Sequence, residues 1–141
     1  MRIMRTIALS LALLAPATAF AGQATLYKNP QCGCCEGHAE HLRRNGLDVT
    51  SVVTHDLALL RQQHGVPADL VGCHMLLIDG YVVEGHVSAA TVKRLLAERP
   101  AIKGIAMPGM PTGVPGMPGP KQGPIEVFAF GAGAPTVYAR E

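Results

Sequence analysis

The sequence predicts an α/β fold with the element order β-α-β-α-β-β-α, followed by an irregular loop and a C-terminal β-hairpin. Three observations predict it. Short runs rich in β-branched and aromatic residues alternate with segments of helical periodicity. Asp79-Gly80, between two apolar runs, is a strong signal for a two-residue hairpin turn. Residues 104–124 are dominated by Gly and Pro, which neither a helix nor an interior strand accommodates.

The expected elements follow in chain order. We expect strands at residues 24–28, 48–53, 74–78 and 81–84, and helices at residues 35–44, 56–64 and 88–99. Asn45-Gly46, Gly65 and Pro100 are the expected stop signals of the three helices. The hairpin is expected at residues 125–130 and 136–140, docked on the domain. This order is that of thioredoxin-like proteins, in which helices cover both faces of a mixed sheet.

The N-terminus has the features of a secretory signal peptide. Arg2 and Arg5 precede an apolar run, and Ala19 and Ala21 supply the small residues that a signal peptidase reads. We therefore expect residues 1–21 to be removed and residues 22–141 to form one exported domain in the periplasm. The apolar run is about half of the ~20 residues that a spanning helix needs, so we expect no membrane span after cleavage.

The charge of the exported chain is close to zero. Without Arg2 and Arg5 the 12 Lys and Arg residues fall to 10, which equals the number of Asp and Glu residues. The chain has no basic run, and only 4% of its residues are Phe, Trp or Tyr. Since nucleic-acid binding needs a basic surface and aromatic side chains for stacking, we expect no nucleic-acid partner.

Three of the four cysteines fall within the four residues Cys32-Gly33-Cys34-Cys35, and the fourth is Cys73. Two structural disulfides are the usual interpretation for an exported protein. Neighbouring cysteines rarely meet bridge geometry without strain, because the two Cα atoms need to lie about 4.4–6.8 Å apart. The crowded sulfur atoms therefore favour metal or redox chemistry. Clustered thiolates favour Zn²⁺, Cu(I) or an iron–sulfur cluster, and bridging thiolates suit several Cu(I) ions.

The expected position of the cysteines supports both kinds of chemistry. Cys32-Gly33-Cys34-Cys35 stands at the start of the first helix, where the helix dipole favours thiolate. Cys32 and Cys35 also form a C-x-x-C pair, so a thiol–disulfide oxidoreductase is the alternative function. Cys73 stands before the third strand, where thioredoxin-like proteins have a cis-proline, and should face the C-x-x-C loop. A pure thiol enzyme needs neither Cys34 nor Cys73.

Histidines and methionines supply further candidates. His86 is expected to reach the cluster as a ligand or proton carrier, and His74 is either a ligand or a hydrogen-bonded core residue. His38 and His41 are expected to be solvated helix residues, although His38 lies within one turn of Cys35. The loop methionines Met107, Met110 and Met117 either bind Cu(I) through their thioethers or cover an apolar groove.

Together these motifs resemble the periplasmic copper-resistance proteins called CopG. The resemblance rests on residues 27–35, Cys73-His74, residues 79–87, Pro-Gly-Met-Pro at 108–111, and Gly116-Met117. His38 and Ser88 depart from the family pattern, which has an aromatic residue and a proline there. The resemblance implies a thioredoxin-like fold and a cysteine-bridged cluster of several copper ions beside copper-export components.

The copper ligands that we expect are Cys32, Cys34, Cys35, Cys73 and His86. The resemblance further implies a role in interconverting Cu(I) and Cu(II), which would make the protein a copper oxidoreductase. A passive copper chaperone without redox turnover is equally compatible with the sequence. The thiol enzyme that uses Cys32 and Cys35 is the alternative, but it leaves Cys34 and Cys73 without a role.

Overall fold

The computed structural model describes residues 22–141, so the expected signal peptide at residues 1–21 lies outside the described residues. The elements are β1 (Ala24–Lys28), α1 (Gly33–Arg44), β2 (Val49–Val53), α2 (Leu57–His64), the short 3-10 helix η1 (Ala68–Leu70), β3 (Met75–Ile78), β4 (Tyr81–Glu84), α3 (Ala89–Glu98), β5 (Gly104–Ala106), β6 (Glu126–Phe130) and β7 (Thr136–Arg140). The predicted α/β class and the order β-α-β-α-β-β-α are confirmed. None of the helices in the described part is long and apolar enough to cross a membrane.

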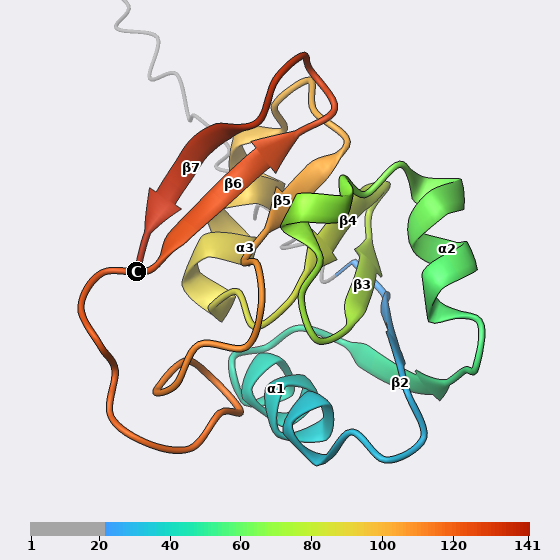
Figure 1. Ribbon diagram of the computed structural model, residues 1–141, viewed down its shortest axis with the longest axis vertical. Coiled ribbons are helices and arrows are strands. Elements are labelled where there is room, and N and C mark those ends of the chain that lie inside the picture. Colours follow the sequence, from blue (N-terminus) through green and yellow to red (C-terminus); the bar gives the residue numbers. More distant parts are fainter. Residues whose placement is uncertain (1–21) are drawn as a thin grey trace, which may run out of the picture.

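The strands form one sheet in the order β2-β1-β3-β4-β5-β6-β7 (Figure 1). β1 runs parallel to β2 and antiparallel to β3, and this pairing sets Tyr27 opposite Met75. The chain that leaves β1 and the chain that enters β3 therefore lie at the same end of the sheet. This register brings the Cys32–Cys35 segment beside Cys73, although the two are far apart in sequence.

Helices cover both faces of the sheet, which is compatible with the predicted thioredoxin-like fold. The first core joins α1 and α3 to alternate residues of β1 and β3, including Leu26, Leu42, Leu76 and Val92. The second core lies on the opposite face and includes Leu57 of α2, Met75, Val82 and Phe130. Because successive strand residues point to opposite faces, neighbouring residues such as Met75 and Leu76 enter different cores. Both cores are mainly aliphatic.

The segment at residues 104–124 differs from the prediction at its start. The sequence led us to exclude an interior strand there, but β5 lies between β4 and β6. The reason is that the first proline of the segment is Pro108, so Gly104–Ala106 keep their backbone donors. Gly104 also allows close packing, since a Cβ at this position would collide with the carbonyl oxygen of Val82. The C-terminal hairpin docks on β5 through β6, as predicted.

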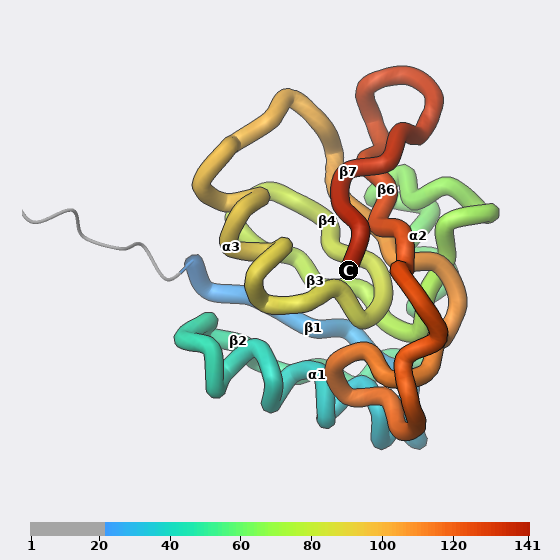
Figure 2. The backbone as a smooth tube through the Cα atoms, turned by 90° about the vertical axis from the view of Figure 1, so that its left-hand side faces the viewer, coloured from blue at the N-terminus to red at the C-terminus, as the bar shows by residue number. Residues whose placement is uncertain are grey.

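The rest of the Pro/Gly/Met-rich segment folds back along helix α1 (Figures 1 and 2). Gly116 and Gly37 approach so closely that a Cβ on Gly37 would lie 3.2 Å from the Cα atom of Gly116. The segment is therefore part of the folded domain.

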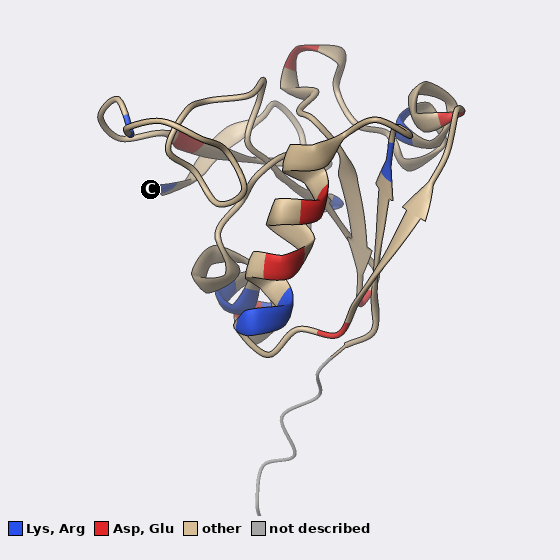
Figure 3. Cartoon of the chain, turned by 90° about the horizontal axis from the view of Figure 1, so that it is seen from below, with Lys and Arg blue, Asp and Glu red and all other residues tan. Residues whose placement is uncertain are grey.

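Helix α1 itself has Glu36 in its first turn and Arg43 and Arg44 in its last turn (Figure 3), an arrangement that complements the helix dipole.

Candidate metal centre

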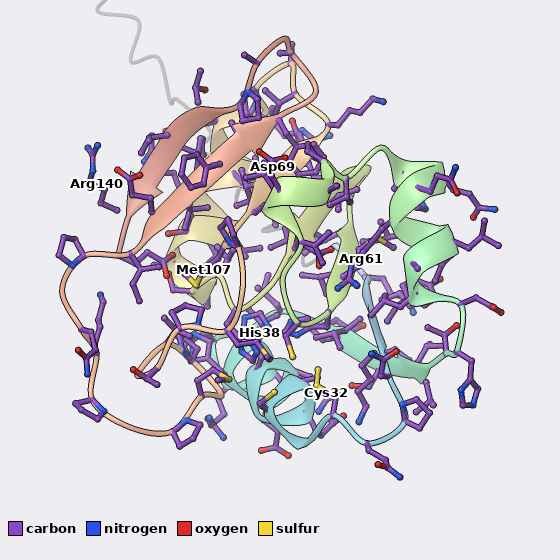
Figure 4. All side chains as sticks on the ribbon, viewed as in Figure 1. Cys32, His38, Arg61, Asp69, Met107 and Arg140 are labelled. Carbon is purple, nitrogen blue, oxygen red and sulfur yellow. A yellow bond between two sulfur atoms is a disulfide. The ribbon has the colours of Figure 1, made fainter. Side chains whose placement is uncertain are left out.

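The sulfur atoms of all four cysteines meet at the end of the sheet where β1 ends and β3 begins. Cys73 Sγ lies 3.3 Å from Cys32 Sγ, 3.4 Å from Cys34 Sγ and 3.5 Å from Cys35 Sγ. Cys32 Sγ and Cys34 Sγ are 3.5 Å apart. The structure thus brings together the four cysteines that the sequence singled out, three from the start of α1 and one from the segment before β3. Figure 4 shows Cys32 at that end of α1.

Local structure explains how each thiol reaches this point. Cys32 is the N-cap of α1, with an extended backbone that turns the chain out of β1, and Cys34 and Cys35 lie in the first helical turn. Cys35 is fully buried in the core, whereas the other three cysteines are partly exposed. Cys32 and Cys35 form a disulfide with Cα atoms 5.3 Å apart, and Cys34 and Cys73 are free thiols.

The environment of Cys73 opposes a free thiolate. Burial raises the pKa of the Cys73 thiol to about 12, and the hydrogen bond to Cys34 acts in the same direction. The thiolate is the form that binds a metal, so a cation that binds here has to displace the proton. A soft cation that bonds to several sulfur atoms at once supplies the needed stabilisation.

A second group, formed by His38, His74 and His86, is completely buried. His38 comes from α1, His74 directly follows Cys73, and His86 follows β4. The ring centroids are 4.7 to 5.2 Å apart. Our expectation that His38 is a solvated helix residue was wrong, because it lies on the same face of α1 as the core residues Cys35, Ala39 and Leu42. His41 is partly buried, and its Nε2 accepts a hydrogen bond from the Ala89 amide.

The hydrogen bonds of the three histidines assign their tautomers. His38 Nε2 lies 2.7 Å from the Val87 carbonyl oxygen and must donate to it, which leaves Nδ1 of a neutral ring as an acceptor. His74 Nε2 then donates to His38 Nδ1 over 2.7 Å. His86 Nδ1 donates to the Pro115 carbonyl oxygen over 2.8 Å. The remaining nitrogens, His74 Nδ1 and His86 Nε2, therefore carry bare lone pairs.

These two nitrogens are buried and have no hydrogen-bond partner among the described residues. Buried polar atoms are nearly always paired, so these two unpaired lone pairs are candidate donors to a cation. Burial also lowers the pKa of His86, of His74, and of His38, for which the value falls to about 3. The rings are thus held in the neutral state that metal binding requires. Donors of this kind fit Cu(I), Cu(II) or Zn²⁺, whereas Mg²⁺ and Ca²⁺ prefer oxygen.

The two groups are joined at two points in the chain. Cys73 and His74 are consecutive, and Cys34 and His38 are four residues apart on α1, which places them on one side of the helix. The cysteine group and the histidine group are therefore neighbours, formed by the start of α1, the start of β3 and the end of β4. The sequence prediction included His86 and left His74 open. It missed His38, which acts here by fixing the tautomer of His74.

The three loop methionines have different surroundings. Met107 is fully buried, and Met117 is partly buried against the first core, as are Cys32 and Cys34. Met110 is 62% exposed. Burial of Met107 supports its interpretation as a packing residue. The contact between this loop and the histidines is made by Pro115, whose carbonyl oxygen accepts a hydrogen bond from His86.

Comparisons with known proteins show which family the chain resembles. A family model described as "Protein of unknown function, DUF411" matches residues 70–117. A solved structure named "Copper resistance protein copG- Form 2" is 38% identical and has a TM-score of 0.79, and the match covers 85% of this chain and 98% of that chain. A second, Form 1, is also 38% identical, with a TM-score of 0.78 and coverage of 84% and 96%. No curated protein sequence matches the chain.

Proposed function

Because the chain belongs to the CopG family of copper resistance proteins, we propose that it binds several copper ions in the periplasm through one cysteine and histidine site. The observation that carries the proposal is the meeting of four cysteine sulfur atoms within 3.5 Å of Cys73 or of one another. In the reduced protein each of these thiolates can bridge two ions, so four sulfur atoms can hold more than one Cu(I).

The ligands we assign are Cys32, Cys34, Cys35 and Cys73, with His86 and His74 as nitrogen donors. The unpaired lone pairs of His74 Nδ1 and His86 Nε2 support the two histidines. His38 is not assigned as a ligand, because both of its ring nitrogens form hydrogen bonds, one with Val87 and one with His74. It orients the His74 ring instead. Mixed sulfur and imidazole donors stabilise both oxidation states of copper, as an interconversion of Cu(I) and Cu(II) requires.

The disulfide offers a balanced route for that interconversion. When the thiolates of Cys32 and Cys35 join as a disulfide, they release two electrons, which reduce two Cu(II) ions to two Cu(I) ions. Cys34 and Cys73 remain as thiols in that state and retain soft donors for Cu(I). The chain would act in this way as a copper oxidoreductase beside copper-export components.

The proposal is tested by anaerobic titration of the reduced protein with Cu(I), followed by metal analysis. We expect more than one tightly held Cu(I) per chain and a preference for Cu(I) over Zn²⁺ in competition. Saturation at one copper ion, or a preference for Zn²⁺, would contradict a copper cluster.

A thiol–disulfide oxidoreductase is the second candidate, and the Cys32–Cys35 disulfide is the observation that favours it. Such an enzyme needs its two thiols and no metal. The measurement is the rate at which metal-free, reduced protein reduces a disulfide substrate. Multiple turnover without copper would support this candidate, whereas reduction of copper without disulfide turnover would support the first.

A further inference from the structure

A buried ion pair outside the metal centre holds the peptide groups of Gly72, the residue before Cys73. Arg61 of α2 donates to Glu84 Oε1 of β4 through Nε (2.9 Å) and Nη2 (2.6 Å). Arg61 Nη2 also donates to the Gly72 carbonyl oxygen over 2.9 Å, and the Gly72 amide donates to Glu84 Oε1 over 2.9 Å. Figure 4 shows Arg61 between α2 and β3. Both backbone polar groups of Gly72 thus depend on this pair.

The segment at residues 71–74 belongs to no helix or extended strand, although Gly72 forms an isolated bridge with Gly109 and packs against the backbone of Gly85 and Met107. Its two remaining backbone hydrogen bonds run from the Gly109 amide to the Val71 carbonyl and from the Gly85 amide to the His74 carbonyl, each 2.9 Å long. These two bonds fix the ends of the segment. The hydrogen bonds that hold the middle, from which the Cys73 side chain leaves, come from Arg61 and Glu84.

Stability alone does not account for this arrangement. The Glu84 side chain is fully buried and that of Arg61 is only 15% exposed. Burying two charges costs free energy, and well-packed apolar residues commonly serve stability as well or better. The second carboxylate oxygen, Glu84 Oε2, is moreover buried with no partner among the described residues. Such a costly pair is best explained by the position that it imposes on the neighbouring backbone.

We propose that Arg61 and Glu84 are positioning residues that hold the Gly72–Cys73 peptide so that the Cys73 thiol meets the three thiols of α1. The planar guanidinium is suited to this task, because its fork reaches a carboxylate and a carbonyl at once. Lysine cannot hold both partners in the same way. The copper readout of this proposal rests on the proposed function, whereas the position of Cys73 can also be measured without metal.

The copper test uses Arg61→Lys and the double variant Arg61→Met/Glu84→Met, which removes both charges together so that neither is left buried and unpaired. We expect Cu(I) affinity to fall about ten- to a hundredfold, as is usual when a group that orients a ligand is lost. X-ray absorption should also show fewer sulfur neighbours per copper ion. Arg44→Ala is the matched control, because Arg44 forms an exposed ion pair with Glu40 on α1.

The metal-free test uses a Cys32→Ser/Cys35→Ser background, which leaves Cys34 Sγ and Cys73 Sγ 3.4 Å apart. Dibromobimane becomes fluorescent when it links two close thiols, and we expect the link to form at least about tenfold more slowly in both Arg61 variants. If linking is slower in the Arg61 variants but the wild-type protein binds no Cu(I), the proposed function is rejected and the positioning role stands. A folded Arg61 variant with the control's linking rate and copper affinity would overturn the proposal. Arg61→Lys provides the same test if the double variant does not fold.

Discussion

Among single residues, the three buried histidines couple the stability of the metal-free protein to pH. Burial lowers the pKa of His38 to about 3 and also lowers those of His74 and His86. In the unfolded chain these rings titrate near 6.5, so below that pH the unfolded state binds more protons than the folded state. The full contribution to stability is therefore present above about pH 6.5. For His38 it is lost as the pH falls from about 6.5 toward 3, by up to about 1.4 kcal/mol per pH unit, and His74 and His86 contribute losses of the same sign.

Urea unfolding of the reduced, metal-free protein between about pH 7 and pH 4 measures this effect. His38→Gln should flatten the pH dependence of the free energy of unfolding. His55→Gln, at an exposed position, should leave it unchanged and serves as the control. An identical pH dependence in the His38 variant and the wild type would contradict the buried neutral state.

Cys34 separates the two candidate functions, because it lies inside the C-x-x-C motif but outside the disulfide. In a copper cluster, Cys34→Ser removes a ligand, so Cu(I) affinity should fall by at least about tenfold, the lower limit known for loss of an outer contact. The number of copper ions per chain should fall as well. Competition with a Cu(I) chelator gives the affinity. Full copper binding in this variant, with intact reduction of disulfide substrates, would favour the thiol enzyme.

The residues of the site differ in how far the sequence could reveal them. Three cysteines in four residues crowd their sulfur atoms in any fold, so their common site was predictable. Cys73 required the additional inference that the third strand lies beside the first. The burial of His38 could have been found, since it lies three residues after Cys35 and four before Leu42, on the apolar side of the helix. The bonds among the histidines depend on side-chain packing and were out of reach.

At the level of elements, the fit of the Pro/Gly/Met-rich segment against α1 depends on Gly116. A Cβ at this position would lie 2.5 Å from the His38 amide nitrogen and 2.7 Å from the Cys34 carbonyl oxygen. We expect Gly116→Ala to push the segment away from α1 and to break the bond between Pro115 and His86. The free energy of unfolding should fall by about 1–3 kcal/mol from overpacking, and proteolysis within residues 107–124 should accelerate.

Gly119→Ala is the matched control for this prediction. Gly119 and Gly116 have nearly the same backbone, with φ of +85° and +86°, so alanine is equally strained at both. At Gly119, however, a Cβ would make only an ordinary contact, 3.5 Å from Thr112 Cβ. Equal effects of the two substitutions would show that backbone strain, and not contact with α1, is responsible.

Among the elements, those with local signals were predictable and β5 was not. Asp79-Gly80 marks the hairpin between β3 and β4, and the glycine and asparagine signals end α1 and α2 close to the expected residues. Gly104–Ala106, by contrast, has little intrinsic preference for a strand. It becomes one because β4 and β6 offer hydrogen-bond partners on both sides, and no window of local sequence contains that information.

For the whole molecule, both cores are built mainly from aliphatic side chains, and the fold should not depend on copper. We expect the reduced protein to keep its circular dichroism spectrum and a cooperative unfolding transition after treatment with a Cu(I) chelator. Copper should then add stability by binding, about 2.7 kcal/mol when free copper exceeds its dissociation constant a hundredfold. A metal-free chain that is unfolded, as in small zinc domains, would show instead that metal builds the fold.

The distance along the chain between Cys35 and Cys73, 38 residues, bears on the order of folding and copper loading. An unfolded chain already presents three thiols in four residues, and copper bound there stabilises the unfolded state as well as the folded one. Such a chain must exchange ligands before Cys73 and the histidines can join. If β1 pairs with β3 before copper binds, the chain binds copper with all of its donors already in place. Refolding in the presence of Cu(I) should therefore be slower than refolding followed by loading, and a carrier that withholds copper until the sheet has formed would speed maturation.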